Sequence, residues 1–208
     1  MKNTRAAVAA GIFILSAPLA MASTLYTDQA AFNAATAGVT TYNFDGYAPA
    51  GETVFSPTVS AGGIAFSAAP GQIFAAWGTG NGYYGDGTFI SGQDPEGVAS
   101  QLNVTIAGGV TAIGFNFGSY VVGANLPVSI TLSTGETFNL LTPANAGVDT
   151  QFIGFTSSTP ITSISIIESG NTIDVTQFQA TSPVPLPASA WLMLSSLSGL
   201  GVLARRRR

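Results

Sequence analysis

A glycine-rich stretch between residues 77 and 87 holds the side chains best suited to binding a sugar. Its alternating glycines predict a flexible loop, from which aromatic rings could stack on sugar rings while side-chain oxygens accept hydrogen bonds from hydroxyl groups. The candidate glycan-binding residues are Trp77, Asn81, Tyr83, Tyr84 and Asp86. The alternative interpretation is a long structural turn whose aromatic side chains cover the edge of the fold.

Acidic residues in turns provide a second chemistry, the binding of calcium. This ion takes about 6–8 oxygen ligands, which carboxylates and backbone carbonyls can supply where turns converge. One candidate set, in the turn-rich stretch 85–97, is Asp86, Asp94 and Glu96, and the other is Asp45 with Asp174. The second set assumes that the first and last strands are neighbours, so that a structural Ca²⁺ would clamp them together. The alternative is that these acids are solvated residues of turns.

The composition excludes many other activities. The chain has no histidine and no cysteine, and no lysine or arginine stands between residues 6 and 204. Zinc or haem sites built on His or Cys, disulfides, Ser-His-Asp triads and Schiff-base lysines are therefore excluded there. All ten acids fall in this interval, which gives it a net charge of −10 and makes nucleic acid an unsuitable partner. We expect no enzyme and no catalytic residue, and the alternative is a glycoside hydrolase or lyase that uses paired carboxylates.

The N-terminus has the three parts of a signal peptide. A positively charged start, residues 1–5, precedes an apolar run, residues 6–15, and a small-x-small cleavage site at Ala20 and Ala22. We expect residues 1–22 to direct export through the Sec translocon and to be removed by signal peptidase, so that the mature chain begins at Ser23. The alternative is an N-terminal membrane anchor.

Residues 183–208 predict a membrane-spanning tail. Prolines at positions 183, 185 and 187 form a stiff lead-in, because each fixes φ and disfavours helix at the residue before it. The uncharged run 188–204 would span roughly 26 Å as a helix at about 1.5 Å per residue, which suits a thin bilayer. The terminal arginines, Arg205, Arg206, Arg207 and Arg208, should stay in the cytoplasm, which places residues 23–182 outside the cell membrane.

This tail resembles the PEP-CTERM sorting signal of Gram-negative bacteria that produce exopolysaccharide. The matching residues are Val184, Pro185, Leu186, Pro187 and Ala188, followed by the apolar run and the arginine cluster. The usual motif is Val-Pro-Glu-Pro, so Leu186 stands where the family has glutamate. The resemblance implies recognition by an exosortase, an inner-membrane intermediate, and delivery to the cell surface or to an extracellular biofilm matrix, where exopolysaccharide is a possible partner. An ordinary tail anchor is the alternative.

Residues 23–182 are patterned as β-structure. Apolar and polar residues alternate over 101–106, 112–117 and 128–132, which predicts strands with one packed face and one wet face. Further strands are expected near Thr41–Phe44, Gly63–Ser67, Gln72–Trp77, Glu136–Leu141, Phe152–Phe155, Ile161–Ile167 and Thr172–Phe178. About ten short strands separated by turns predict an all-β, jelly-roll-like β-sandwich. One short helix is expected at Asp28–Ala35, with Thr27 as its cap and Phe32 as its anchor.

The same region loosely resembles exported β-sandwich domains that precede this sorting signal. The shared features include Tyr42-Asn43-Phe44-Asp45-Gly46 and Ile113-Gly114-Phe115-Asn116-Phe117-Gly118. The two resemblances and the composition together predict an exported, exosortase-sorted protein of the cell surface or extracellular matrix, with a structural or glycan-binding role. A carbohydrate-active enzyme is the alternative.

Overall fold

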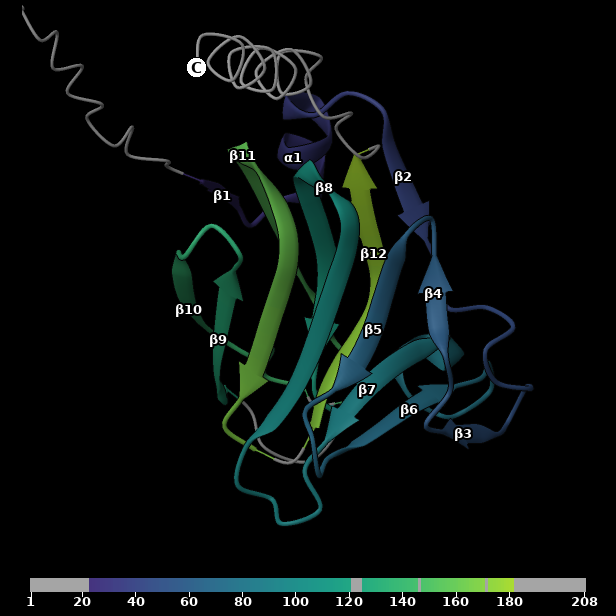
Figure 1. Cartoon of the computed structure of the whole chain (residues 1–208). Helices are drawn as coiled ribbons and strands as arrows, with labels where there is room; N and C mark the ends of the chain where they lie inside the picture. The colour runs from purple at the N-terminus through teal and green to yellow at the C-terminus, as the bar shows by residue number, and fades with distance from the viewer. Residues whose placement is uncertain (1–22, 121–124, 146, 171, 182–208) are drawn as a thin grey trace, which may run out of the picture.

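The computed structural model describes residues 23–120, 125–145, 147–170 and 172–181 (Figure 1). The elements are β1 (Thr24–Tyr26), α1 (Gln29–Ala35), β2 (Val39–Tyr42), β3 (Thr53–Phe55), β4 (Val59–Ala61), β5 (Ile64–Ala68), β6 (Ile73–Trp77), the 3-10 turn η1 (Tyr84–Asp86), β7 (Phe89–Gln93), β8 (Ser100–Gly118), β9 (Pro127–Leu132), β10 (Thr137–Leu141), β11 (Gln151–Glu168) and β12 (Thr172–Thr181). In these ranges no helix is long and apolar enough to cross a membrane. The predicted cleavage residues Ala20 and Ala22 and the whole predicted sorting signal lie outside the described residues.

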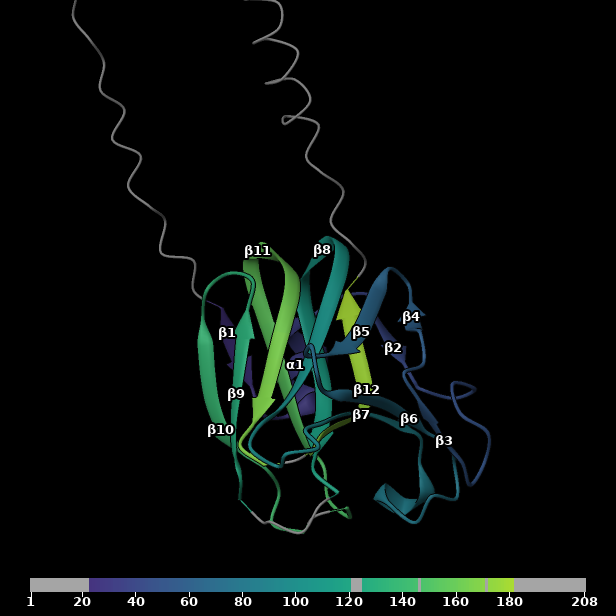
Figure 2. The same cartoon turned by 60° about the horizontal axis from the view of Figure 1, so that its bottom comes forward.

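Two long strands, β8 and β11, run through both layers of a sandwich (Figures 1 and 2). Residues 102–106 of β8 pair with β5, and residues 100–105 pair with the last third of β11. Residues 112–117 pair with the start of β11, and residues 113–118 pair with β12. One layer therefore has the order β10-β9-β11-β8-β5-β4, and the other has β1-β11-β8-β12-β7-β6-β3, with β2 beside the end of β12.

The arch in these two strands has a local cause. Gly108 and Gly109 in β8 have φ values of 77° and 70°, which residues with side chains rarely adopt. The ladder between β8 and β11 is irregular at the same place, with register shifts on either side of Ile161. A Cβ atom on Gly109 would lie only 2.8 Å from the Cβ of Pro160. The bend thus needs glycine in one strand, and it lets each strand serve both layers.

The alternating residues of the sequence form the core between the layers. Ile113, Phe115 and Phe117 are fully buried. Their buried partners on the neighbouring strands are Ile153 and Phe155 of β11 and Val175, Phe178 and Ala180 of β12. The ring of Phe115 stacks on that of Phe178, with centroids 6.0 Å apart and an interplanar angle of 7°. The prediction of an all-β sandwich is confirmed. The prediction of short strands is wrong at 101–117 and 152–167, because each pair of predicted strands is one arched strand.

The single predicted helix is present on the outer face of one layer. Its N-cap is Asp28, whose Oδ1 accepts a hydrogen bond from the amide of Ala31 at 2.7 Å. The prediction of Thr27 as the cap is therefore wrong, because the helix begins at Gln29 and the cap is the residue directly before its first turn. The prediction for Phe32 is confirmed, since its ring is fully buried beside Phe152 at 5.5 Å.

The first described residue is fastened to a distant hairpin. The backbone nitrogen of Ser23 donates to Oε1 of Glu136 at 2.7 Å, and its hydroxyl donates to Oε2. These two bonds lower the pKa of Glu136. The described residues contain a paired set of strands and two clusters of buried apolar side chains, which is the kind of core that a domain needs to fold by itself.

Candidate functional site

The predicted aromatic loop forms a cluster of rings at the end of β6. Trp77 stacks on Phe89, with centroids 5.3 Å apart and an interplanar angle of 8°. The rings of Tyr83 and Tyr120 approach Trp77 at 5.8 Å and 5.1 Å. The indole Nε1 donates to the buried hydroxyl of Ser91 at 3.1 Å. Most of the aromatic surface that could stack on a sugar is thus used within the protein.

Asn81 holds the loop closed. Its Nδ2 donates to the carbonyl oxygens of Gly78 and Gly87, and its Oδ1 accepts from the amide of Tyr83 at 2.8 Å. Glycine is required at residue 78, because a Cβ atom there would lie 1.8 Å from the carbonyl oxygen of Pro49. These contacts are those of a structural turn, and a sugar-binding role for Trp77, Asn81 and Tyr83 stays a prediction. Asp86 lies in η1, and its side chain is outside the description.

A polar groove of about 360 Å³ lies next to this cluster. Its floor comes from β8 and β12, and its walls come from the chain after β2, the loop around η1 and the segment before β11. The lining residues are Asn43, Asp45, Thr79, Tyr84, Gly87, Thr88, Asn116, Val148, Thr150, Thr176 and Gln177. Two of them, Tyr84 and Asp45, were candidates from the sequence, although for different sites.

A β-bulge in β12 shapes the floor of the groove. Val175 pairs with Phe117 of β8, and Gln177 pairs with Asn116, so Thr176 is the extra residue. A bulge breaks the alternation of side chains and re-aims them. Thr176 and Gln177, although consecutive in the chain, therefore both line the groove, and both are half-buried in a strand that is otherwise buried almost throughout.

The groove presents polar groups that the protein leaves unused. Within the described residues, no hydrogen bond involves the side chains of Asn43, Asn116, Thr150 or Thr176. The carboxylate of Asp45 is exposed and accepts one hydrogen bond, from the hydroxyl of Thr88 at 2.8 Å. The amide and hydroxyl groups in the groove can donate and accept hydrogen bonds, as recognition of sugar hydroxyls requires.

A buried acid lies behind the wall of the groove. Asp174 is fully buried, and its Oδ2 accepts a hydrogen bond from the Tyr84 hydroxyl at 2.7 Å, while the amide of Tyr120 also donates to this carboxylate. Burial raises the pKa of Asp174 well above its usual range, against these two donors. Burial, and after it the neighbouring Asp174, also raises the pKa of the Tyr84 hydroxyl. The same two causes, with burial the larger, raise the pKa of Tyr120 to about 12.

Glu168 is a second fully buried acid. Its Oε2 accepts from the hydroxyl of Ser100 at 3.2 Å. Burial raises the pKa of Glu168 to about 7, although the Ser100 hydroxyl and the amides of Thr172 and Gly170 oppose the shift. The negative charge of Glu168 also contributes to the raised pKa of Asp174, so the two acids interact.

The structure separates the acids that the sequence grouped as calcium ligands. The first and last predicted strands are indeed neighbours, because β2 pairs with β12, but Asp45 contacts Thr88 whereas Asp174 contacts Tyr84. Asp94 uses its carboxylate to accept from the amides of Glu96, Val98 and Ala99, which lowers its pKa. Glu96 is exposed. In the part of the chain that the structure describes, no three acidic side chains come together as a metal site.

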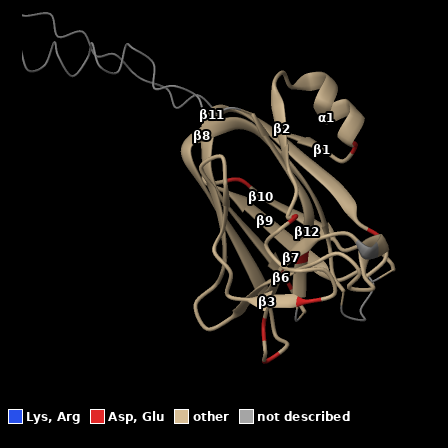
Figure 3. Cartoon of the chain, turned by 90° about the vertical axis from the view of Figure 1, so that its right-hand side faces the viewer, with Lys and Arg blue, Asp and Glu red and all other residues tan. Residues whose placement is uncertain are grey.

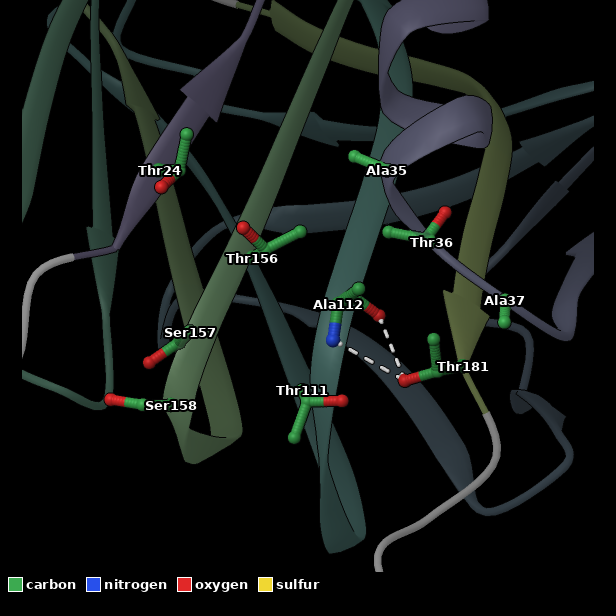
Figure 4. A pocket seen from close by; sticks show the side chains of 10 residues that line it. All are labelled: Thr24, Ala35, Thr36, Ala37, Thr111, Ala112, Thr156, Ser157, Ser158 and Thr181. Carbon is green, nitrogen blue, oxygen red and sulfur yellow. Dashed lines mark hydrogen bonds between the residues drawn. The ribbon is translucent and has the colours of Figure 1, made fainter.

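A larger hollow, of about 500 Å³, lies where the strands arch (Figure 4). It is lined by threonine, serine and alanine, and it includes Thr24 and Thr181 from the two ends of the described chain. The hydroxyl of Thr181 bonds the backbone of Ala112 there, at 3.3 Å to the amide and 3.4 Å to the carbonyl. This hollow has no carboxylate, amide side chain or aromatic ring, so the groove beside Tyr84 is the better candidate.

Comparisons with known proteins give only weak structural matches. No protein-family model matches the chain, and no curated protein matches it. A family 6 carbohydrate-binding module matches with a TM-score of 0.36 and 16% identity, over 66% of this chain and 95% of that one. CsCBM6-3 from Clostridium stercorarium, solved in complex with cellobiose, matches with a TM-score of 0.35 and 12% identity, over 66% of this chain and 98% of that one. A family two carbohydrate esterase from Cellvibrio japonicus matches with a TM-score of 0.31 and 9% identity, over 71% of this chain and 36% of that one. Similarity this low is evidence neither of a common fold nor of a common ligand.

Proposed function

We propose that residues 23–182 form an exported, jelly-roll-like module that binds a glycan in the groove beside Tyr84 and does not act on it chemically. The observation that carries this proposal is the set of amide and hydroxyl groups on the groove floor. Asn116 and Thr176 make no side-chain hydrogen bond among the described residues, and Gln177 uses only its Oε1, which accepts from Nε2 of Gln29 at 3.1 Å. The ring of Tyr84 at the wall offers an apolar edge beside these polar groups. Such a combination suits a sugar, which has hydroxyl groups on its rim and C–H groups on its faces.

The charge of the domain narrows the class of glycan. Between residues 6 and 204 the chain has ten acids and no lysine or arginine. Uronic acid, sulfated or phosphorylated polymers would be repelled by this charge and would meet no cationic side chain in the groove. The proposed ligand is therefore a neutral glycan, such as an uncharged segment of an exopolysaccharide.

The groove favours binding over hydrolysis. Glycoside hydrolases use two carboxylates on opposite sides of the bond that they cleave. Of the lining side chains that the structure describes, only Asp45 carries a carboxylate. Export by the predicted signal peptide and sorting by the predicted C-terminal signal, which would deliver the module to the cell surface or matrix, belong to the same proposal and rest on the sequence.

Binding can be tested with a glycan array followed by calorimetry on protein comprising residues 23–182. We expect neutral oligosaccharides to bind, and Asn116→Ala and Gln177→Ala each to weaken the dissociation constant about 2–10-fold, because each removes hydrogen bonds worth about 0.5–1.5 kcal/mol. Asn139→Ala is the matched control, because Asn139 is exposed on β10, outside the groove. A dissociation constant that is unchanged in both groove variants, or binding that requires an anionic glycan, would disprove the proposal.

A further inference from the structure

We infer that the hydrogen bond from Tyr84 to Asp174 holds one wall of the groove in place, and that ionisation of Asp174 releases this wall, so that the groove loses affinity for its glycan in alkaline solution. We call residues 82–87 the Tyr84 wall. The loss of affinity rests on the proposed function, whereas the movement of the wall does not. Three observations carry the inference: the complete burial of the acid, the position of Tyr84 between the acid and the groove, and the backbone conformation of Tyr84.

Asp174 is enclosed without a counter-ion. Its exposed fraction is 0%, and its Oδ1 is one of three buried polar side-chain atoms in the described residues that have no hydrogen-bond partner. The residues paired with it are Ser91 of β7 and Gly118 of β8, and neither carries a charge. No lysine, arginine or histidine occurs between residues 6 and 204. A negative charge on Asp174 would therefore be buried uncompensated, which is strongly unfavourable.

The titratable groups that face Asp174 are two tyrosines and a second acid. Burial is the main cause of the raised pKa of Asp174, and it outweighs the hydrogen bonds from the Tyr84 hydroxyl and the Tyr120 amide. Glu168 of β11 is also fully buried, and its negative charge opposes the ionisation of Asp174 further. Because burial raises the pKa of Glu168 to about 7, we expect Glu168 to ionise first and Asp174 to follow at a higher pH.

Tyr84 lies between Asp174 and the solvent in the groove. Of the described residues that line the groove, only Tyr84 forms a hydrogen bond with Asp174. Its side chain also fills the place of a side chain at Gly118, because a Cβ atom there would lie 2.9 Å from Oη and 3.0 Å from Cε1 of Tyr84. Movement of the Tyr84 side chain out of this place would let water from the groove reach the acid.

The Tyr84 wall has a backbone conformation that favours its release. Tyr84 has a φ of 50°, and Gly85 has a φ of 67°, so two consecutive residues are left-handed. A residue with a side chain rarely adopts this conformation, and it persists only where other contacts hold it. The side chain of Asn81 bonds backbone carbonyls on both sides of the wall, which keeps the base of the loop closed. Loss of the bond to Asp174 should therefore let the wall relax without unfolding the sheet.

The direction of the pH effect follows from these contacts. Protonated Asp174 can stay buried, so Tyr84 remains in contact with it and completes the groove. Ionisation strengthens the hydrogen bond from Tyr84, but this gain is smaller than the cost of a buried charge beside the charged Glu168. Water that reaches the acid lowers that cost, so the open wall becomes favoured. The open form binds one proton fewer, and its share grows up to about tenfold per pH unit.

The test uses protein comprising residues 23–182 between about pH 6 and about pH 9, with a chelator present throughout. Trp77 is the only tryptophan in this stretch, and Phe89 lies between it and Tyr84, in contact with both rings. We expect acrylamide to quench Trp77 fluorescence more strongly as the pH rises, along one titration curve and with an unchanged β-sheet circular dichroism spectrum. The dissociation constant for a neutral oligosaccharide should increase about tenfold or more with the same midpoint.

Two different failures can be told apart. If quenching and the dissociation constant are both independent of pH, the inference is overturned and glycan binding in the groove stands. If no neutral oligosaccharide binds at any pH, the proposed function fails, and the quenching curve still decides whether the wall moves: a rise with pH supports the movement, and a flat curve overturns it.

Three variants assign the titration to Asp174. Asp174→Asn has no charge to gain, so quenching should stay low and binding tight over the whole range. Glu168→Gln should move the midpoint to lower pH, because a neutral residue no longer opposes the ionisation of Asp174. Glu96→Gln is the matched control, since it removes one exposed carboxylate and should leave the curve unchanged.

The inference is overturned if Asp174→Asn keeps the pH dependence or if Glu96→Gln shifts the midpoint as much as Glu168→Gln does. Should Asp174→Asn fail to fold, the midpoint in Glu168→Gln decides alone: a lower midpoint supports the inference, and one that is unchanged or higher overturns it.

Discussion

Tyr84 connects the surface of the molecule to its interior. Its ring lines the groove and packs edge-on against Phe89 at 5.1 Å, while its hydroxyl reaches the buried Asp174. The backbone of Tyr84 has a φ of 50°, a left-handed conformation that is uncommon for a residue with a side chain, and its amide donates to the carbonyl of Gly147 at 2.7 Å. The hydrogen bonds at both ends of this residue thus offset a local backbone cost.

Removing the Tyr84 hydroxyl should destabilise the domain. In Tyr84→Phe the side chain of Asp174 loses its hydrogen bond to the Tyr84 hydroxyl, and removing one partner of a buried hydrogen bond costs about 1–3 kcal/mol. Tyr83→Phe is the control, because the Tyr83 hydroxyl has no hydrogen bond within the described residues. Urea denaturation of both variants in the presence of a chelator measures the difference, and equal midpoints for the two would contradict the role of this bond.

Glu168 should make the domain less stable as the pH rises. Its pKa in the folded protein is about 7, against a usual value of 4.5, because burial disfavours the charged form. A raised folded pKa means that the stabilisation is complete below about pH 4.5 and is lost as the pH rises through about 7. We expect a loss of roughly 1–3 kcal/mol over this range in chelator. Glu168→Gln should flatten part of the decline, whereas an identical pH profile in this variant would assign the decline to other groups.

Two glycines on neighbouring strands form the surface on which helix α1 packs. Gly114 of β8 and Gly154 of β11 are paired in register. A Cβ atom on Gly154 would lie 2.6 Å from Cδ2 of Phe32, and one on Gly114 would lie 2.7 Å from Cζ of Phe152. The absence of side chains at these two positions lets the Phe32 ring approach the backbone of the sheet closely and become completely buried.

A side chain added at this packing surface should weaken the packing of helix α1 on the sheet. Gly154→Ala should destabilise the domain by about 1–3 kcal/mol, because an extra methyl group overpacks a closed site. Combining it with Phe32→Ala, which removes the clashing ring, should make the added cost of the alanine much smaller, so that the double-mutant cycle shows a coupling of about 1 kcal/mol or more. Additive effects of the two substitutions, measured by urea denaturation, would contradict this packing.

The sequence predicts the elements whose signal is local and misses those whose signal is not. Residues 101–106 and 112–117 alternate and are strands, but the intervening Gly108 and Gly109 read as a turn and are instead the bend of one long strand. Strand β7 shows no alternation because it is buried on both faces, and β1, β3 and β4 are too short, at three residues each, for any period to appear.

The candidate site was predictable only in part for the same reason. The groove depends on the bulge at Thr176, which is a property of strand pairing and leaves no mark in the sequence. Asp174 stood out as an acid in an apolar strand, but its neighbours Tyr84 and Gly118 come from other parts of the chain. The only available signal was composition, since the stretch between residues 6 and 204 has no lysine or arginine with which to balance a buried acid.

Because the chain has no lysine or arginine between residues 6 and 204, a positive charge at a new N-terminus in this stretch would have no other cation beside it. Figure 3 shows acidic residues scattered over the described chain and no basic ones, in agreement with the sequence between residues 6 and 204. If the chain is cleaved before Ser23, the new amino group is the only positive charge in residues 23–182. That nitrogen lies 2.7 Å from Oε1 of Glu136.

Cleavage at this position should therefore stabilise the module through one ion pair. In protein that begins at Ser23, Glu136→Gln should lower Tm more than it does in protein that retains residues 20–22, because only the former has an ammonium group at residue 23. The difference should shrink as NaCl is added, since salt screens an exposed pair. Equal loss of Tm in the two backgrounds would show that Glu136 acts only as an acceptor for a neutral amide.

Thr24 and Thr181 share one hollow at the arched end of the sandwich (Figure 4). Thr150 in the groove stands directly before β11, and Thr156 in the hollow follows it by six residues, a separation of about 20 Å where the chain is extended. A tether on either flank would thus leave from one pole while the groove lies nearer the opposite pole. Copies anchored to one surface would then present their grooves on the side away from that surface. A long polymer that binds several grooves at once would bind with an avidity that increases with the density of the copies.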